Sequence, residues 1–464
     1  MREWKRENKM ENNIGNADKF YKNVIRIAVP VTLQSLLQSS FSVVDQLMIG
    51  TLGSSSIAGV GLGGKFVSLY SVPLSAIAAA AGIMISQYMG KQEEKEISRS
   101  YFSNLFLALT LGILFACMCV LFPGKIMWFY TKDGVTGAIG AGYLRILALS
   151  FLPMAVTSLT TTLLRCMEAA MFPLYASIAA VMLNTLLNYL LIFGKAGVPQ
   201  LGANGAAIAT VLSQIVLCAM TLAFFFYHYK KQKIKMRLIW RFHGSAKKQY
   251  LGILCPILVC EFLWSLGENV YGAIYGNMGT QACAAITLTV PIQTLLIGAL
   301  SGLSQAAGIM IGKSLGSGAY EKAYRESKQL MWYGFGGSLV LSVLLLFAGP
   351  FYVRFYQVEP EVRRSAVRLL VAFAVIAPVK VQNMILGGGI IRSGGKTKYI
   401  MWVDFIGTWI FGVPLGLLSA FVWKLPIPSV YFILSLEECV RLGITFVLFR
   451  KRGWMRSLES GETS

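Results

Sequence analysis

The string Ala80-Ala81-Gly82-Ile83-Met84-Ile85 recurs letter for letter as Ala306-Ala307-Gly308-Ile309-Met310-Ile311, 226 positions later in a chain of 464 residues. The same spacing pairs prolines and glycines throughout both halves: Pro30 with Pro256, Gly50 with Gly276, Gly53 with Gly279, and Gly90 with Gly316. Farther along, Pro153 pairs with Pro378 and Arg165 with Arg392, each one residue away from that spacing. A nearly constant offset does not hold by chance over so many positions, so one half of the chain is a copy of the other.

The composition is that of a membrane protein. Hydrophobic residues make up 55% of the chain and charged residues only 14%, and the mean hydropathy is +0.61, which excludes a soluble domain with a polar surface. Apolar stretches approach the roughly 20 residues that a spanning helix needs. They fall at about 27–50, 58–88, 101–122, 142–164, 174–194, 204–226, 253–275, 284–311, 331–350, 368–391, 399–421 and 429–449. We therefore predict an all-α integral membrane protein with 12 transmembrane helices.

The copy boundary divides these helices into two sets of six. We expect an N-terminal six-helix bundle over 1–228, a basic linker over 229–249 and a C-terminal six-helix bundle over 250–464. An even number of helices in each copy inserts both copies the same way up. The two bundles are then related by a pseudo-twofold axis along the membrane normal, and they face each other across a central cleft.

Lys and Arg are concentrated on one predicted side of the membrane. That side holds both chain tails and the linker, whereas the opposite connections hold few basic residues, such as Lys132, Lys195 and Lys424. The positive-inside rule then places both termini in the cytoplasm and the chain in the plasma (inner) membrane as a multi-pass protein. This asymmetry explains the net charge of +21 as an orientation signal, so we expect no nucleic-acid partner. The polar start lacks the pattern of a cleavable signal peptide, so the first helix directs insertion.

The chain offers no signature of an enzyme or a cofactor site. Its only histidines are His228 and His243, near or in the linker, and no Cys/His spacing typical of a metal site occurs. Most of the eight cysteines lie in apolar stretches, and the one close pair, Cys117 and Cys119, points to different sides of a helix. We expect no catalytic residue, no cofactor and no metal apart from a transported Na⁺.

Polar side chains inside the first copy suggest a cation site. Asp45 lies well inside the first span with Gln38 two turns earlier, and Asn184 and Asn188 share one face of the fifth span. Thr210 lies within the sixth. A carboxylate among neutral oxygen donors suits H⁺ or Na⁺, and a charge inside a membrane is costly enough to mark function. The alternative for Asn184 and Thr210 is a purely structural hydrogen bond between helices.

The second copy differs at these positions. At the same spacing Asp45 corresponds to Tyr271 and Gln38 to Trp264, while Glu261 and Glu268 lie nearby in the seventh span. A carboxylate beside aromatic surface is suited to an organic cation. Lys380, Asp404, Glu437, Glu438 and Arg441 lie in later spans, where Lys380 needs an acidic partner and Glu437 can pair with Arg441 at i, i+4. We predict that five residues of the second copy contact the substrate: Glu261, Trp264, Glu268, Tyr271 and Lys380. The alternative is a buried network that only fixes the bundle.

Three runs resemble the multidrug and toxic compound extrusion (MATE) family, bacterial type. They are Pro30-Val-Thr-Leu-Gln-Ser-Leu-Leu-Gln38-Ser-Ser-Phe-Ser-Val-Val-Asp45-Gln-Leu-Met-Ile-Gly50, Glu261-Phe-Leu-Trp-Ser-Leu-Gly267 with Tyr275-Gly276-Asn-Met-Gly279, and Asn184-Thr-Leu-Leu-Asn188-Tyr-Leu-Leu-Ile-Phe-Gly194 with Leu201-Gly-Ala-Asn-Gly205. The resemblance implies the MATE fold and a secondary active antiporter. Such a protein exports organic, often cationic, amphipathic compounds in exchange for H⁺ or Na⁺ by alternating access.

Two positions depart from the family pattern. Where members tend to have a Gly-rich turn after Arg165, this chain reads Cys166-Met167-Glu168, and Asn188 stands where some members carry a second carboxylate. An alternative function within the superfamily is a flippase for lipid-linked saccharides or lipids, which is expected to have several cationic residues in its cavity. The expected partners are small-molecule drugs or metabolites and membrane lipids, and the chain is expected to act as a monomer.

Overall fold

The computed structural model describes residues 2–195, 197, 199–232, 238–239, 244–356 and 358–459, almost all of them helical. The first half contains these elements in chain order: α1 (Arg2–Gly50), α2 (Ser54–Lys91), α3 (Glu94–Leu121), α4 (Pro123–Tyr130), α5 (Gly134–Leu147), the 3₁₀ turn η1 (Ala148–Ser150), α6 (Phe151–Cys166), α7 (Met171–Phe193) and α8 (Gly202–Gln232). Together α5, η1 and α6 make one span of 33 residues. The short helix α4 was not expected from the sequence. It starts at Pro123, whose fixed φ suits the first turn of a helix.

The second half repeats the succession of six spans, although its shorter elements differ. Its elements are α9 (Gly244–Asn277), α10 (Thr280–Gly316), α11 (Tyr320–Arg354), α12 (Pro360–Asn383), the π-helix η2 (Met384–Ile391), α13 (Thr397–Phe405), the π-helix η3 (Ile406–Gly412), α14 (Val413–Leu417), the π-helix η4 (Leu418–Val422), α15 (Ile427–Ser435) and α16 (Glu437–Arg450). The elements α12 and η2 form one span, α13 to η4 form the next, and α15 and α16 meet at Leu436 to form the last.

Each predicted apolar stretch coincides with one of these helical spans to within one residue at its end, which confirms the prediction of 12 helices. Within the described residues, 10 spans are long and apolar enough by themselves to cross a membrane. The remaining two are α1 and the pair α15–α16, whose members of 9 and 14 residues are each too short alone. The predicted linker is partly helical, because α8 reaches Gln232 and α9 begins at Gly244, while its residues 233–237 and 240–243 lie outside the described residues.

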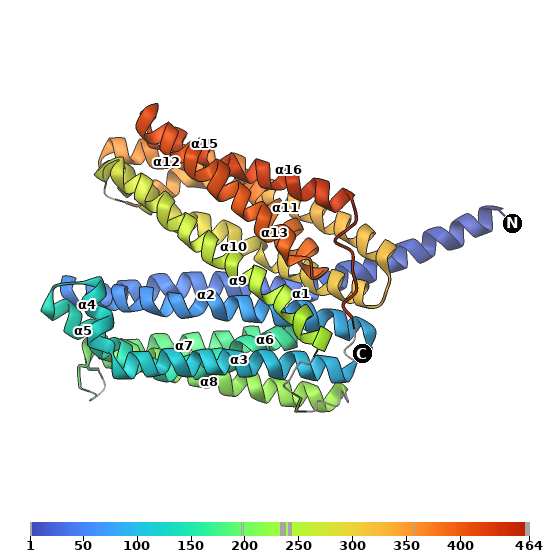
Figure 1. Cartoon of the computed structure of the whole chain (residues 1–464). Helices are drawn as coiled ribbons and strands as arrows, with labels where there is room; N and C mark the ends of the chain where they lie inside the picture. The colour runs from blue at the N-terminus through green and yellow to red at the C-terminus, as the bar shows by residue number, and fades with distance from the viewer. Residues whose placement is uncertain are drawn as a thin grey trace.

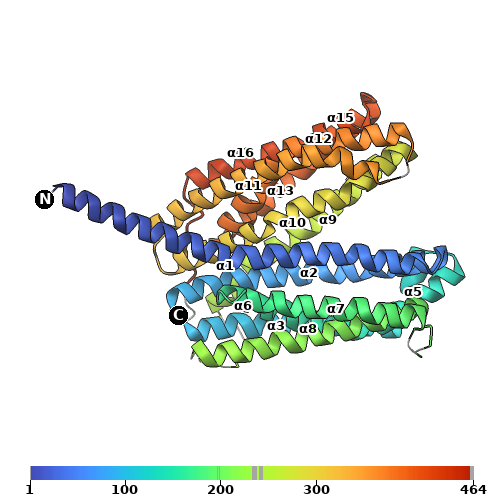
Figure 2. The same ribbon diagram turned by 180° about the vertical axis from the view of Figure 1, so that it is seen from behind.

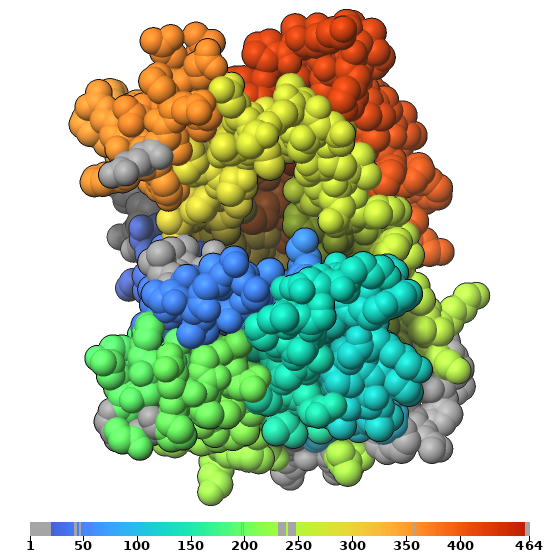
Figure 3. Space-filling model, turned by 90° about the vertical axis from the view of Figure 1, so that its left-hand side faces the viewer, coloured from blue at the N-terminus to red at the C-terminus, as the bar shows by residue number. Residues whose placement is uncertain are grey.

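The two halves form separate bundles that are joined at one end. Figures 1 and 2 show α1 to α8 in one bundle and α9 to α16 in the other, with both chain termini at the end where the bundles meet. The bundles diverge toward the opposite end, where α4 and α15 lie. Viewed from that open end, the surface is hollowed between the yellow residues of α9 and α10 (Figure 3).

The seam between the bundles is reciprocal, as two copies related by a twofold axis require. A Cβ added at Gly90 of α2 would lie 2.1 Å from the carbonyl oxygen of Lys313 in α10, and one added at Gly316 would lie 1.9 Å from the carbonyl oxygen of Gln87. These positions correspond at the repeat spacing of 226. Only glycine therefore permits this close crossing of α2 and α10.

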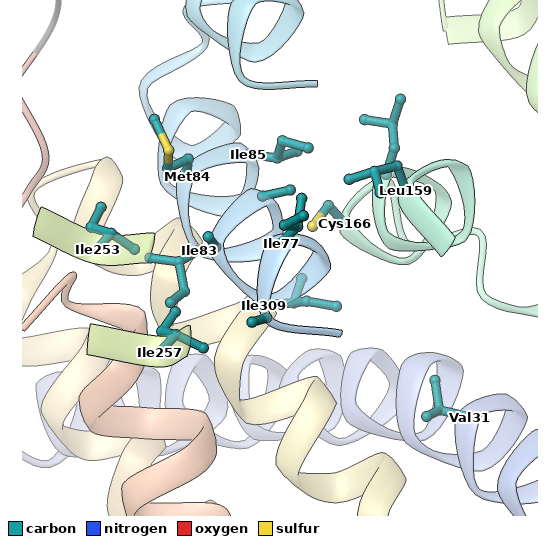
Figure 4. Close-up of a cluster of buried hydrophobic side chains, with 14 of the residues drawn as sticks. Val31, Ile77, Ile83, Met84, Ile85, Leu159, Cys166, Ile253, Ile257 and Ile309 are labelled. Atoms are coloured by element: carbon teal, nitrogen blue, oxygen red, sulfur yellow. The ribbon is translucent and has the colours of Figure 1, made fainter. Parts of the chain in front are cut away.

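Apolar side chains fill the seam around that crossing. Figure 4 shows Ile83 of α2 near Ile257 of α9 and Ile309 of α10, while Leu159 of α6 lies on the other side of α2. The repeated string contributes directly, since Ala80, Ala81, Ala306 and Ala307 have no exposed surface. Small and β-branched residues let the helices approach closely, which is how helices associate in lipid without a strong hydrophobic driving force.

The C-terminal segment closes the joined end. After α16 it crosses to the first bundle, where the backbone N–H of Leu458 donates to Gln87 Oε1 at 2.7 Å and Lys91 Nζ donates to the carbonyl oxygen of Leu458. Trp454 in this segment is fully buried. An ion pair of 2.6 Å between Lys313 of α10 and Glu168 also joins the bundles. The backbone of Glu168 has a φ of 60°, a conformation that glycine adopts easily and that is strained for glutamate. In return, Glu168 supplies the carboxylate for this ion pair between the bundles.

Candidate functional site

Two cavities open where the bundles diverge from the seam. The first, of about 430 Å³, lies mainly in the N-terminal half between α1, α2, α6 and α8. The second, of about 480 Å³, lies in the C-terminal half between α9, α10, α12, η2, α13 and α16. Both are lined by Ser304, Gln305, Gly388 and Arg392, so they adjoin at the boundary between the halves. Volumes of this size are typical of small-molecule sites.

The predicted cation residues are partly brought together. Asn188 Nδ2 donates to Asp45 Oδ1 at 2.7 Å and to Asn184 Oδ1 at 3.1 Å. Asn184 Nδ2 in turn lies 3.4 Å from the hydroxyl of Ser213, a residue that the sequence did not single out. The carbonyl oxygen Asn188 Oδ1 is buried and has no hydrogen-bond partner within the described structure. A buried acceptor without a donor beside a carboxylate is the environment in which a cation gains most.

The other two predicted members lie elsewhere. The hydroxyl of Thr210 donates to the carbonyl oxygen of Ala206 in its own helix at 2.9 Å, so it is not directed at Asp45. Gln38 lines the first cavity. The cluster that the structure assembles is thus Asp45, Asn184 and Asn188, with Ser213 behind it.

The second cavity is lined by a network of ion pairs. Arg441 pairs with Glu437 at 3.2 Å and with Asp404 at 3.7 Å, and Arg392 pairs with Glu261 at 3.3 Å and with Asp404 at 3.8 Å. The partner of Lys380 is Glu438 of α16, at 3.9 Å. The i, i+4 pair and the need of Lys380 for an acid from another helix were both predicted from the sequence. Among the described residues no group of three or more His, Cys, Asp and Glu side chains forms a metal site.

The predicted substrate residues divide into two groups. Trp264, Glu268 and Lys380 line the second cavity, and both Trp264 and Glu268 are exposed. Glu268 lies within 4.0 Å of no Lys or Arg nitrogen in the described part of the chain. Glu261 is held by Arg392, whereas Tyr271 is buried and donates its hydroxyl to Glu437 at 2.5 Å, so neither lines the cavity. The available contacts for a ligand are therefore a free carboxylate and an indole.

The repeat generates one polar chain in each half. In the first half Arg165 donates to Gln34 Oε1 at 2.6 Å, and Gln34 donates to the hydroxyl of Ser177 at 2.7 Å. The equivalent residues in the second half are 226 or 227 positions later. There Arg392 donates to Cys260 Sγ at 2.9 Å, and the Cys260 thiol donates to Asp404 Oδ2 at 2.7 Å.

Only the charged members of each hydrogen-bonded series could be recognised from the sequence. Arg165 and Arg392 correspond in the repeat, and the structure places both arginines in the wall of the first cavity. The neutral members carry no charge that would mark them. Gln34 and Cys260 are more than a hundred positions from their arginines, and Ser177 lies on a different helix from Arg165. Their part in the site was therefore missed.

Two six-helix copies that are joined at one end and contain adjoining polar cavities have the architecture of many membrane transporters. A family model described as MatE matches residues 30–190 and 256–418, so the chain belongs to the MatE family. The two matched segments begin 226 positions apart, the spacing of the internal repeat. The family is one of transporters rather than of enzymes. The resemblance seen in the three sequence runs is confirmed.

Similar proteins cover nearly the whole chain. The uncharacterized transporter YisQ of Bacillus subtilis is 22% identical, over 95% of this chain and 96% of its own length. The probable multidrug resistance protein NorM of Thermotoga maritima is 23% identical, over 93% of each chain. A solved structure of MATE in the bent conformation matches with a TM-score of 0.84 at 17% identity, covering 93% of this chain and 95% of the other. An outward-facing multidrug resistance MATE transporter of the MOP superfamily matches with a TM-score of 0.79 at 18% identity and the same coverage. These likenesses establish the fold.

Proposed function

We propose that the protein is a secondary active multidrug efflux antiporter that exports organic, often cationic, amphipathic compounds in exchange for H⁺ or Na⁺. The observation that carries the proposal is Asp45, a carboxylate inside a spanning helix whose partner Asn188 keeps a buried carbonyl oxygen without a donor. Family membership supports the transport class, and the names of the NorM relatives support the kind of substrate.

The coupling ion acts at the Asp45 cluster. Either proton or Na⁺ neutralises the carboxylate, and Na⁺ also gains the amide oxygens of Asn184 and Asn188 as hard ligands. Neutralising Asp45 changes the hydrogen bond that ties α1 to α7. The ion then biases the first bundle between two arrangements because it binds one of them more strongly.

The substrate binds in the second cavity. Glu268 supplies the charge, and Trp264 supplies a face for an aromatic or quaternary cation. The remaining acids there are paired with Lys380, Arg392 and Arg441, so they hold the wall of the cavity rather than attract a ligand. Small-molecule cations are therefore the favoured class.

We further propose that residues 1–228 and 250–464 move as two domains about the glycine crossing of α2 and α10. The basic tails lie at the joined end, so the positive-inside rule makes that end cytoplasmic and the open end external. In this orientation the structure is open to the outside of the plasma membrane. The chain acts as a monomer in this scheme because one copy supplies both cavities: the C-terminal half lines the second cavity and also contributes residues such as Ser304 and Gly388 to the wall of the first.

A flippase for lipid-linked saccharides is disfavoured by the cavity charges. Such a ligand carries a pyrophosphate and requires several uncompensated cations. In the described structure Lys380, Arg392 and Arg441 are all paired with acids, and only Arg165 among the cavity cations has no ion pair.

The test is transport in liposomes. The protein is reconstituted, and efflux of a fluorescent organic cation is followed under an imposed pH gradient or an imposed Na⁺ gradient. We expect Asp45→Asn to abolish gradient-driven efflux while Asp133→Asn, the same change at an exposed helix start, leaves it intact. Undiminished transport in Asp45→Asn would refute the coupling role, and comparing the gradients identifies the ion.

A further inference from the structure

The first cavity contains a positive charge that no acid in the described structure neutralises. Its lining includes no Asp or Glu, and its only charged members are Arg165 and Arg392. Arg392 is paired with Glu261 and Asp404, whereas the side-chain hydrogen bond of Arg165 goes to the neutral amide oxygen of Gln34. The Nε of Arg165 is buried without a partner among the described residues. Buried cations are normally paired, because an isolated charge in a low-dielectric interior is costly.

The rest of the lining suits an anion. The cavity of Arg165 is also lined by hydroxyls and amides that can donate to oxygen without adding negative charge: Gln38, Thr157, Ser158, Thr161 and Gln214. A planar guanidinium with unused donors recognises carboxylate or phosphate through paired hydrogen bonds. The cavity thus has the composition of an anion site.

The two adjoining cavities therefore have opposite unpaired charges. Among the described residues, Arg165 of the first cavity and Glu268 of the second form no ion pair. Their common wall is formed by Ser304, Gln305, Gly388 and the ion-paired Arg392, and a molecule that lies across it meets Arg165 at one end and Glu268 at the other. A purely cationic ligand uses only the second end.

We propose that Arg165 binds an anionic group, a carboxylate or a phosphate, of a zwitterionic substrate whose cationic group is held at Glu268. This inference rests on the proposed function, since it assigns a second subsite to the same transported molecule. Molecules that carry both a cationic and an anionic group would then be favoured substrates, which the acidic C-terminal cavity alone does not distinguish from simple cations.

The anion site also explains why Gln34 is not an acid. A carboxylate at that position would lie within hydrogen-bond distance of Arg165 and would neutralise it, as Asp404 and Glu261 neutralise Arg392 in the other half. The change Gln34→Glu preserves size and shape. It therefore tests the charge of Arg165 without removing the side chain.

The experiment uses two dyes that differ only in the anionic group. Rhodamine 110 carries a free carboxyl, and rhodamine 123 is its methyl ester. Binding of each to the purified full chain is measured by fluorescence polarisation, and efflux from liposomes is measured alongside. Arg165→Gln and Gln34→Glu are expected to weaken rhodamine 110 binding about tenfold and to leave rhodamine 123 unchanged. Arg165→Lys retains most of the preference, and Arg145→Gln, the same change at an exposed position of α5, alters neither dye.

Each contrary result has a separate meaning. If Arg165→Gln binds rhodamine 110 as well as the parent does, or weakens both dyes equally while thermal stability is retained, the anion site is wrong and export of cations still stands. If the parent exports neither dye, the proposed function fails together with the inference. A third arm follows flipping of fluorescent phosphatidylglycerol in the same vesicles. Arg165-dependent flipping without Arg165-dependent rhodamine 110 binding would overturn the proposal in favour of a lipid headgroup.

Discussion

The two hydrogen-bonded series that begin at Arg165 and Arg392 have the same order of donors and acceptors, but only in the second do acids balance the charge of the arginine. Arg165–Gln34–Ser177 is neutral apart from its arginine, whereas Arg392–Cys260–Asp404 has its charge balanced by Asp404 and by Glu261. The spacing of the donors and acceptors is nearly the same in both halves, whereas the middle residue is an amide in one and a thiol in the other, and the last residue is a neutral serine in one and a carboxylate in the other. The comparison teaches that backbone symmetry in a repeat protein does not imply equivalent sites.

The same difference extends to neighbouring positions. Gln214 in the wall of the first cavity corresponds to Arg441 in the second, and Thr210 corresponds to Glu437, both at a spacing of 227. Asp45 reverses the pattern, since its counterpart Tyr271 is uncharged. Charged residues of one half therefore correspond to neutral residues of the other at these positions, so the two cavities differ in charge although the halves share a spacing.

The largest expected effect comes from removing the balanced arginine. Arg392→Gln leaves Glu261 and part of the charge of Asp404 without a counterion, and breaking a buried pair costs about 3 kcal/mol or more. Arg165→Gln breaks no ion pair and is expected to change stability by less than about 1 kcal/mol. Thermal unfolding of both variants in detergent measures the difference. Equal losses would mean that Arg165 has an acidic partner after all.

The seam should behave symmetrically where the cavities do not. Gly90→Ala and Gly316→Ala each place a Cβ about 2 Å from a carbonyl oxygen of the facing helix, so each forces α2 and α10 apart at a cost of about 1–3 kcal/mol. We expect both to separate the joined end to the same extent. Distances between spin labels on α2 and α10 report this movement, with Gly336→Ala, which meets open space, as the control. A marked inequality would break the twofold description of the seam.

A smaller effect distinguishes the free carboxylate from the paired one. Glu268→Gln is expected to weaken binding of an organic cation about tenfold without loss of stability, because Glu268 forms no ion pair of 4.0 Å or less within the described residues. Glu261→Gln removes a partner of Arg392 and is expected to lower stability with little direct effect on binding. Titration with the dye, together with thermal unfolding, separates the two. If Glu261→Gln weakens binding more than Glu268→Gln at retained stability, the assignment of the carboxylates is reversed.

The smallest effect is expected at Cys260. A serine hydroxyl accepts from Arg392 and donates to Asp404 as the thiol does, so Cys260→Ser should change stability by less than about 0.5 kcal/mol. Cys260→Ala removes both hydrogen bonds and is expected to cost about 1–3 kcal/mol. Thermal unfolding ranks the three proteins. A serine variant as unstable as the alanine variant would show that packing rather than hydrogen bonding matters here.

Hydropathy predicted the fold well because a lipid environment leaves the chain few choices. Every spanning segment must satisfy its own backbone, so long apolar runs become helices wherever they occur. The grouping of Asp45 with Asn184 and Asn188 was predicted from their positions within spans and from the i, i+4 spacing of the two asparagines, but the hydrogen bond from the Asn188 amide to Asp45 was not. The helix α4 was missed, since its eight residues lie outside any span-length apolar run.

Side-chain directions were harder to predict than helices. Thr210 was expected to face Asp45, but a threonine in a helix can satisfy its hydroxyl on the carbonyl one turn earlier, and it does so here. Gln38 shares a helical face with Asp45 yet lies two turns away, which is far enough to line the first cavity instead. The directions of these side chains depend on how each helix is rotated about its axis and on which distant spans pack together. A single sequence contains no pattern that reports either property.

The π-helix η2 bears on how the two copies have diverged in length. Twelve positions separate Pro153 from Arg165, but fourteen separate Pro378 from Arg392, and η2 lies within the longer interval. In a regular α-helix two added residues rotate everything after them by about 200°, which would turn Arg392 to the far side. A wider turn absorbs additional residues locally, so Arg392 still faces the cavity beside Arg165. A π-helix can therefore accommodate residues inserted in one copy of a repeat without changing the direction of the side chains that follow it.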